Sequence, residues 1–200
     1  MKHTDIIQKL NLEQKCALLS GETVFTTRAL PGKGIPAITL SDGPNGVRKQ
    51  AGAADHLGLN PSVPATCFPT SSATACSWDE KLGEAVGEAL GEEAAAQEVA
   101  VLLGPGLNIQ RSPLCGRDFE YFSEDPLLTG KMACAQLRGM HRWGVTGTIK
   151  HFATNNQEHR RHFVESVVSE RALREIYLRG FEIAVKEGLS LIHISEPTRP

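Results

Sequence analysis

The residues of this chain best suited to chemistry are charged side chains in three separate segments. Asp42 lies in the first segment, Arg117 lies in a polar loop over residues 104–125, and Lys150 and His151 are adjacent in the third. A carboxylate and three potential cations can bind one polar ligand only if the fold brings them together. Their chemistry therefore depends on the elements that place them.

Each of these segments follows a short apolar stretch that is typical of a buried strand. The predicted strands cover residues 37–40, 100–103 and 146–149. The carboxyl ends of parallel strands meet at one edge of a sheet, where barrel enzymes build their active sites. The sequence therefore predicts a polar pocket at that edge, lined by Asp42, Arg117, Lys150 and His151.

Amphipathic helices are predicted between the strands, which favours parallel α/β architecture. Two short helices are expected over residues 4–10 and 11–19, and three longer ones begin after Ser77, Asp125 and Ser169, which have N-cap character. The residues expected to face inward on the longer helices are Leu82, Val86, Ala89, Leu90, Leu128, Met132, Leu137, Met140, Leu173, Ile176, Tyr177, Phe181 and Ala184. Three strands do not finish such a sheet, so they form the first part of a (β/α) barrel or part of a doubly wound sheet.

The composition excludes several classes of function. The chain has 200 residues with 21 basic and 23 acidic side chains, so there is no electrostatic case for nucleic acid or for an anionic membrane. No apolar run approaches the roughly 20 residues of a membrane span. Five cysteines without a CxxC pair indicate reduced thiols, and with a charged start they favour a cytoplasmic protein.

Each candidate residue also has a plainer interpretation. Asp42 before Gly-Pro could form only an Asx turn, and Arg117 with Glu120 could be a surface ion pair. Lys150 could be the Schiff-base lysine of an unrelated barrel enzyme, such as an aldolase. His151 could be a metal ligand, but no His or Cys cluster with metal spacing accompanies it, so no metal site is expected.

Three long motifs carry a specific family resemblance. Residues 41–48, SDGPNGVR, resemble the SDGP-x-G-x-R segment of family 3 β-glucosidases. Residues 108–126, NIQRSPLCGRDFEYFSEDP, resemble the NI-x-R-x-P-x-x-GR-x-FE-x-x-SEDP block of that family. Residues 150–158, KHFATNNQE, resemble its KHF-x-x-NNQE block, and Arg161 stands at the expected place after it. The motifs occur in the family's order, and the resemblance covers about residues 8–188.

The resemblance implies a site that binds one terminal glucose ring. Asp42 would accept hydrogen bonds from hydroxyls on the O4/O6 side of the sugar, as suits an ionised carboxylate. Arg117, Lys150 and His151 would donate to its other hydroxyls. Arg161 would shape and polarise the site, and Arg48 would lie nearer the rim. The implied partner is a small β-glucoside or oligosaccharide, with no cofactor.

The resemblance also implies that the reacting carboxylates lie elsewhere. Retaining glycosidases need two carboxyl groups, one as nucleophile and one as acid/base. In the family the nucleophile is an aspartate in an SDW-like segment on a later barrel strand, and the acid/base comes from a following domain. No SDW occurs here, and the carboxylates Asp42, Asp118, Glu120 and Glu124 match binding or structural positions.

The expected fold is therefore an incomplete (β/α)8 TIM-type barrel, roughly its first half, over residues 1–188. Residues 189–200 are expected to be a non-native tail, although the apolar alternation in 189–194 also fits a natural strand. The expected function is that of a truncated retaining β-glucosidase acting on terminal non-reducing β-D-glucosyl residues, itself without turnover. The alternatives are a non-catalytic sugar-binding fragment and a β-xylosidase-type member of the same family.

Overall fold

The fold is built on a parallel four-stranded sheet with the strand order β1-β2-β3-β4. The computed structural model describes residues 3–52, 59–161 and 163–192. The strands are β1 (Leu40–Asp42), β2 (Val101–Leu103), β3 (Thr146–Ile149) and β4 (Leu191–Ile192). Adjacent strands pair in sequence order, which is the arrangement of consecutive β-α-β units.

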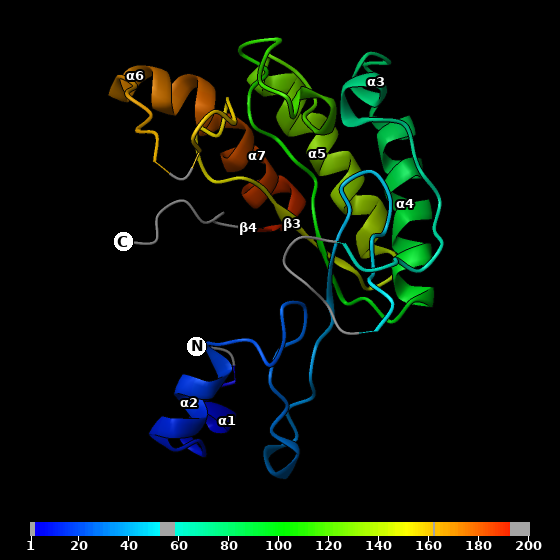
Figure 1. Ribbon diagram of the computed structural model, residues 1–200, viewed down its shortest axis with the longest axis vertical. Helices are drawn as coiled ribbons and strands as arrows, with labels where there is room; N and C mark the ends of the chain where they lie inside the picture. Colours follow the sequence, from blue (N-terminus) through cyan, green and yellow to red (C-terminus); the bar gives the residue numbers. More distant parts are fainter. Residues whose placement is uncertain (1–2, 53–58, 162, 193–200) are drawn as a thin grey trace.

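Helices pack against one face of this sheet, as Figure 1 shows. The helices are α1 (Thr4–Gln8), α2 (Leu12–Leu18), α3 (Ser71–Ala75), α4 (Glu80–Ala96), α5 (Pro126–His141), α6 (Glu170–Ala172) and α7 (Arg179–Gly188). The hydrophobic core lies between the sheet and α4, α5 and α7, and its largest members include Leu90, Leu102, Met132, Leu137, Met140, Ile149 and Phe181. By contrast, α1 and α2 bury none of their side chains and project from the body of the molecule (Figure 1).

The first strand begins later than the sequence predicts. The apolar stretch 37–40 was expected to form it, but β1 covers Leu40–Asp42, so Asp42 is its last residue. The preceding residues also pair with an earlier segment, because Thr27 N donates to Ile38 O at 3.0 Å and Thr26 bridges Thr39 in antiparallel fashion. Apolar character alone could not distinguish these two partners. The predicted strands β2 and β3 are confirmed to within one residue.

The predicted cap of α4 is wrong, whereas the predicted cap of α5 is confirmed. Asp125 accepts a hydrogen bond from Leu128 N at 2.8 Å, and Pro126 is the first residue of α5. In α4 the cap is Asp79 instead of Ser77, because Ser77 Oγ donates to Thr74 O at the end of α3. The chain turns between the two helices, so Ser77 belongs to the end of the first.

The buried face of α4 is formed mainly by glycines, and of the predicted inward stripe only Leu90 is fully buried. Gly83, Gly87, Gly91, Leu90 and Ala94 are the buried residues of this helix. Leu82, expected inward, is 45% exposed. A Cβ on Gly87 would lie 2.1 Å from Gln136 O of α5, so the two helices approach too closely for larger side chains. A pattern of apolar side chains cannot indicate this face, because glycine has no side chain.

The predicted single helix after Ser169 is interrupted. Ser169 caps α6 as expected, since its Oγ accepts from Ala172 N at 3.3 Å. A π-helical turn over Leu173–Tyr177 then separates α6 from α7 and changes the helical register. As a result, Ile176 is 38% exposed, while Phe181 and Ala184 lie in the core as predicted.

The predicted boundary at residue 188 falls next to a strand. Helix α7 ends at Gly188, and β4 then pairs with β3 through Thr148↔Leu191 and Ile149↔Ile192. The expectation that 189–200 is a non-native tail stays a prediction, and residues 193–200 lie outside the described part of the chain.

We predict that Gly139→Leu destabilises the chain by about 1–3 kcal/mol, because overpacking an interior contact forces the backbone to shift. A Cβ on Gly139 would lie 2.2 Å from Glu84 O and 2.4 Å from Glu88 N, both in the backbone of α4. The free energy of unfolding in urea measures the effect. The control Gly32→Ala, where a Cβ meets nothing within 4 Å, should leave stability nearly unchanged. Equal effects from the two substitutions would contradict the close packing of α4 on α5.

Candidate functional site

The parallel register of the sheet joins the first and third polar segments. Lys150 follows the last residue of β3, and its Nζ donates to Asp42 Oδ1 at 2.8 Å. The side chain of Lys150 is 5% exposed and that of Asp42 is 39% exposed. The ammonium group is thus buried while part of the carboxylate remains open to a ligand.

The ion pair controls the ionisation of Asp42. Burial acts to raise the pKa of Asp42, but the opposing effects, led by the charge and the hydrogen bond of Lys150, together outweigh it, so the pKa lies below its usual value. The backbone N–H of Gly43 and the charge of Arg48 act in the same direction. Asp42 is therefore ionised at neutral pH and is a hydrogen-bond acceptor.

The guanidinium group of Arg117 is held by two carboxylates. It donates to Glu120 from Nε at 3.2 Å and from Nη2 at 2.7 Å, which is a bidentate geometry. Its Nη1 lies 3.5 Å from Glu158 Oε1. Glu120 is only 6% exposed, so the plainer interpretation of Arg117 and Glu120 as a surface ion pair is wrong.

His151 links Arg117 to the buried core of the loop after β2. Its Nε2 lies 2.9 Å from Arg117 Nη2, and its Nδ1 lies 3.1 Å from the hydroxyl of Tyr121. Asn108 binds the backbone of His151 on both sides, with its Nδ2 donating to O at 2.8 Å and its Oδ1 accepting from N at 2.7 Å. Contacts to both the backbone and the ring nitrogens of His151 therefore fix the position of its imidazole.

The two outer candidates attach to the edge of this cluster. Arg161 Nη1 donates to Glu158 Oε2 at 2.9 Å, so Glu158 connects Arg161 with Arg117. Arg48 is exposed, and its backbone N donates to Asp42 O at 2.9 Å. The structure thus joins Asp42 to Lys150 and Arg117 to His151, and the adjacency of Lys150 and His151 in the chain brings the two pairs together, with Arg48 and Arg161 at the periphery.

Sequence reasoning missed four residues that hold this cluster together: Asn108, Tyr121, Asn155 and Glu158. Asn155 Nδ2 donates to Glu158 Oε1 at 3.0 Å and lies 3.3 Å from the hydroxyl of Tyr121. Glu158 could have been found, because it stands three residues before Arg161 in the same motif. The pairing of Tyr121 with the histidine has no signal in the sequence.

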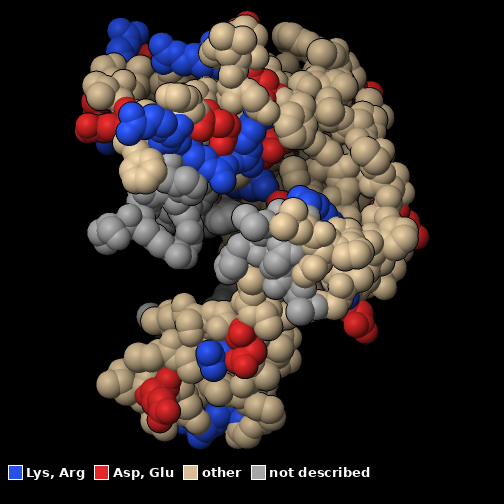
Figure 2. Space-filling view, in the orientation of Figure 1, with Lys and Arg blue, Asp and Glu red and all other residues tan. Residues whose placement is uncertain are grey.

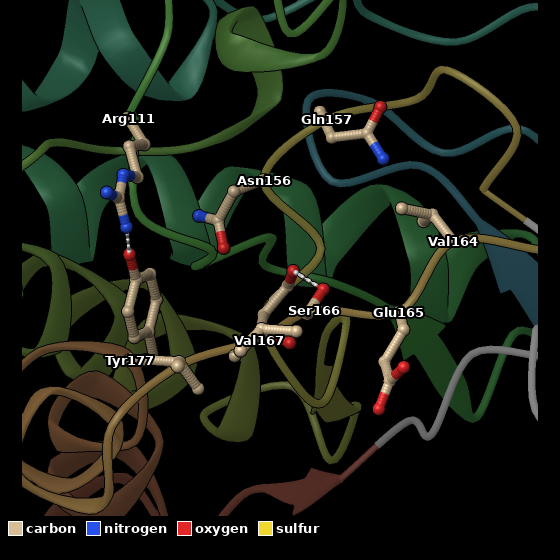
Figure 3. A pocket seen from close by; sticks show the side chains of 10 residues that line it. Arg111, Asn156, Gln157, Val164, Glu165, Ser166, Val167 and Tyr177 are labelled. Carbon is tan, nitrogen blue, oxygen red and sulfur yellow. Dashed lines mark hydrogen bonds between the residues drawn. The ribbon is translucent and has the colours of Figure 1, made fainter.

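A separate hollow lies on the other side of the segment 154–158. Its lining residues are Arg111, Thr154, Asn156, Gln157, Val164, Glu165, Ser166, Val167, Val168 and Tyr177. Figure 3 shows Arg111 pointing at Tyr177, whose hydroxyl it binds, and the guanidinium carbon also lies 5.9 Å from the centre of that ring. Asn155 and Glu158 contact the charged cluster, whereas their neighbours line the hollow. This segment therefore forms a wall between the two regions.

The distribution of charged and potentially metal-binding side chains limits which ligands the described part of the chain could hold. On the face shown in Figure 2, Lys and Arg side chains gather at the upper left with Asp and Glu among them. Among the described residues, no three His, Cys, Asp or Glu side chains form a group that could hold a metal ion. None of the described helices could cross a membrane. All five cysteines lie in the described part of the chain and are free thiols.

A parallel sheet with helices on one face and a charged cluster at the carboxyl ends of its strands is the general plan of α/β enzymes. The particular family follows from comparison with known proteins. The chain belongs to glycosyl hydrolase family 3, because residues 35–196 match the N-terminal domain of that family. The resemblance in the three motifs is thereby confirmed.

Relatives within the family include β-glucosidases. The chain is 54% identical over 183 residues to Thermostable beta-glucosidase B from Acetivibrio thermocellus, covering 92% of this chain and 24% of that protein. It is 47% identical to Exo-alpha-(1->6)-L-arabinopyranosidase from Bifidobacterium longum, covering 91% and 24% respectively. The crystal structure of Beta-glucosidase from Kluyveromyces marxianus in complex with glucose superposes with a TM-score of 0.88 at 41% identity, covering 94% of this chain and 22% of that one. The chain thus spans about a quarter of the length of these relatives.

We predict that Lys150→Met raises the pKa of Asp42 above its usual value. The substitution removes the opposing charge and hydrogen bond but leaves the burial that acts to raise this pKa. In the unsubstituted chain the lowered pKa adds stability above the unfolded-state pKa of Asp42, and this is lost as pH falls through the folded-state value. In the variant the sign reverses, and the contribution of Asp42 is lost as pH rises. A titration followed by the carboxyl carbon signal of Asp42 measures the shift.

Arg48→Gln is the matched control, because Arg48 is the weakest of the groups that lower the pKa of Asp42. It should raise that pKa only slightly. If Asp42 titrates alike in both variants, Lys150 does not control it.

Proposed function

We propose that the chain is the front part of the first catalytic domain of a retaining β-glucosidase, and that its charged cluster binds the terminal glucose of a β-glucoside. The observation that carries the proposal is the convergence of Asp42, Arg117, Lys150 and His151, which come from three distant parts of the chain. Family membership and the glucose complex of a structural relative support the same ligand class.

The chemistry of the cluster suits a ring with several hydroxyl groups. An ionised carboxylate accepts hydrogen bonds from hydroxyls, and such charge-assisted bonds are stronger than neutral ones. Asp42, which stays partly open, takes this role on the O4/O6 side of the sugar. Lys150 and Arg117 donate to other hydroxyls while remaining paired with Asp42 and Glu120. His151 is the fourth residue proposed to contact the hydroxyls of the sugar.

Arg161 and Arg48 belong to the rim of the proposed site. The side chain of Arg161 is 45% exposed, and its link to Glu158 lets it polarise the cluster from outside. Arg48 is exposed next to Asp42. Both could approach a sugar that has entered the site, and neither is buried deeply enough to shape its floor.

The proposed fold is the first half of a (β/α)8 barrel. The parallel order β1-β2-β3-β4 and the helices on one face support it. Side chains alternate along each strand, so Val101 and Leu103 point away from the face on which Leu102 is buried in the core. In a barrel that second face becomes the interior, which is filled by side chains of the strands themselves.

The proposed role of the chain is binding and positioning, with the reacting groups supplied by the rest of a longer protein. A retaining glycosidase places two carboxyl groups about 5–5.5 Å apart across the scissile bond. We assign Asp42, which is paired with Lys150, and Glu120, which is paired with Arg117, to binding and structure, because they stand at such positions in the family motifs. The hydrolysis proposed for that longer protein requires no cofactor.

A relative favours a second candidate for the sugar specificity. The arabinopyranosidase from Bifidobacterium longum carries a name that refers to a pentopyranose and yet is 47% identical to this chain. The same cluster could thus accept a sugar without the C6 hydroxymethyl group, as a β-xylosidase-type member would. Comparing the affinities of glucose and xylose distinguishes the two candidates, because only a glucose-specific site gains from hydrogen bonds to O6.

We predict that the chain binds glucose and that Asp42→Asn weakens binding about 10-fold or more, which corresponds to loss of a hydrogen bond to a charged group. Isothermal titration calorimetry measures the dissociation constant. Glu92→Gln, an exposed substitution on α4, should leave the affinity unchanged. The chain should release no nitrophenol from nitrophenyl β-glucoside. Equal affinity of both variants would refute the proposed site, and steady release of nitrophenol would refute the proposed absence of turnover.

A further inference from the structure

We propose that Tyr121 is a positioning residue that holds His151 in its Nδ1–H tautomer, so that Nε2 stays an acceptor for Arg117. The functional consequence rests on the proposed sugar site, whereas the tautomer is inferred from the contacts of the imidazole ring. Tyr121 stands at an unspecified position (x) of the FE-x-x-SEDP motif, so the family resemblance gives it no role. It lies in the loop after β2, next to Glu120.

The backbone of His151 is held in place, so its ring cannot shift toward other hydrogen-bond partners. Asn108 is 2% exposed, and its amide binds both the N–H and the carbonyl of His151. The backbone is therefore fixed at the point from which the ring projects. The ring itself is buried, with 7% of the side chain exposed. Its two nitrogens must accordingly suit the neighbours that the fold provides.

The partner at Nε2 determines where the proton lies. An arginine side chain is only a hydrogen-bond donor, so Nε2 must accept the bond from Arg117 Nη2 at 2.9 Å. A neutral imidazole carries one N–H, which is then on Nδ1. The hydroxyl of Tyr121, 3.1 Å from Nδ1, is placed to accept it. The opposite tautomer would set the N–H of His151 against an N–H of Arg117, and Glu120 Oε1, 4.0 Å from Nε2, lies beyond hydrogen-bond distance.

Tyr121 is suited to this task because it is a rigid and neutral acceptor. It is fully buried, and its ring meets that of His151 edge-on, with centroids 6.1 Å apart at 80°. Burial raises the pKa of Tyr121 well above its usual value, so the hydroxyl stays protonated at neutral pH. Asn155 Nδ2, 3.3 Å away, also donates to this oxygen and holds it in place.

The consequence reaches the sugar through Arg117. Two carboxylates and the imidazole fix the guanidinium plane, and the imidazole contributes only while Nε2 lacks a proton. Removing the hydroxyl of Tyr121 takes away the acceptor that favours Nδ1–H, which shifts the balance toward the other tautomer or a mixture. Arg117 then loses one of its three anchors and is less well prepared to donate to a hydroxyl of the ligand.

The test reads the tautomer directly. In the 15N-labelled chain, two-bond 1H–15N correlation spectra distinguish a protonated ring nitrogen from an unprotonated one. The chain has seven histidines, and His151→Gln identifies the signals of this one. We expect Nδ1 protonated and Nε2 unprotonated in the unsubstituted chain at neutral pH. An Nε2–H tautomer or an imidazolium there would overturn the proposal without any variant of Tyr121.

The chain offers a matched control, since it has two tyrosines. Tyr121→Phe keeps the ring that packs on His151 but should shift the nitrogen signals of that residue toward the other tautomer. Tyr177→Phe removes the hydroxyl that binds Arg111 and should leave those signals unchanged. An unaltered spectrum in Tyr121→Phe, or equal changes in both variants, would show that the hydroxyl of Tyr121 does not select the tautomer.

Glucose affinity separates this proposal from the proposed function. Tyr121→Phe should weaken the binding of glucose about 5-fold, the effect of one neutral hydrogen bond, while Tyr177→Phe should not. If the unsubstituted chain shows the expected tautomer but binds no glucose, the sugar site fails and the role of Tyr121 toward His151 stands. If glucose binds and Tyr121→Phe changes the tautomer but not the affinity, the positioning of Arg117 is refuted.

Discussion

The ion pair between Lys150 and Asp42 is the contact on which the candidate site depends. The two residues are 108 positions apart, and the parallel order of β1, β2 and β3 brings them to within 2.8 Å. The pair neutralises a buried ammonium group, which would otherwise be costly. It also keeps Asp42 ionised and partly open. One geometric constraint therefore supplies both stability and an acceptor for a polar ligand.

The rest of the cluster repeats this principle of paired charges. Glu120 and Glu158 hold Arg117, and Glu158 extends the network to Arg161. A cation that is already paired keeps its orientation without a ligand, so less conformational entropy is lost when a sugar binds. The cluster thus combines fixed donors with one open carboxylate, a combination that suits recognition of a hydroxyl-rich ring.

The sequence predicted those features that depend on local patterns. The strands β2 and β3, the Asp125 cap and the convergence of polar residues followed from apolar runs, capping residues and the geometry of parallel sheets. Features that depend on distant partners could not be predicted. The glycine face of α4 exists because Gly87 meets Gln136 of another helix, and no pattern within α4 reveals that approach. The same holds for the hydroxyl of Tyr121 beside His151.

The most direct test of the sugar-binding claim is a crystal structure of the chain soaked with glucose. The account predicts one glucose ring in which a hydroxyl lies within hydrogen-bond distance of the Asp42 carboxylate and others contact Arg117 and Lys150. The ion pair between Asp42 and Lys150 should persist in that complex. Glucose bound only in the hollow beside Arg111 and Tyr177, or a structure in which Asp42 and Lys150 lie apart, would contradict it.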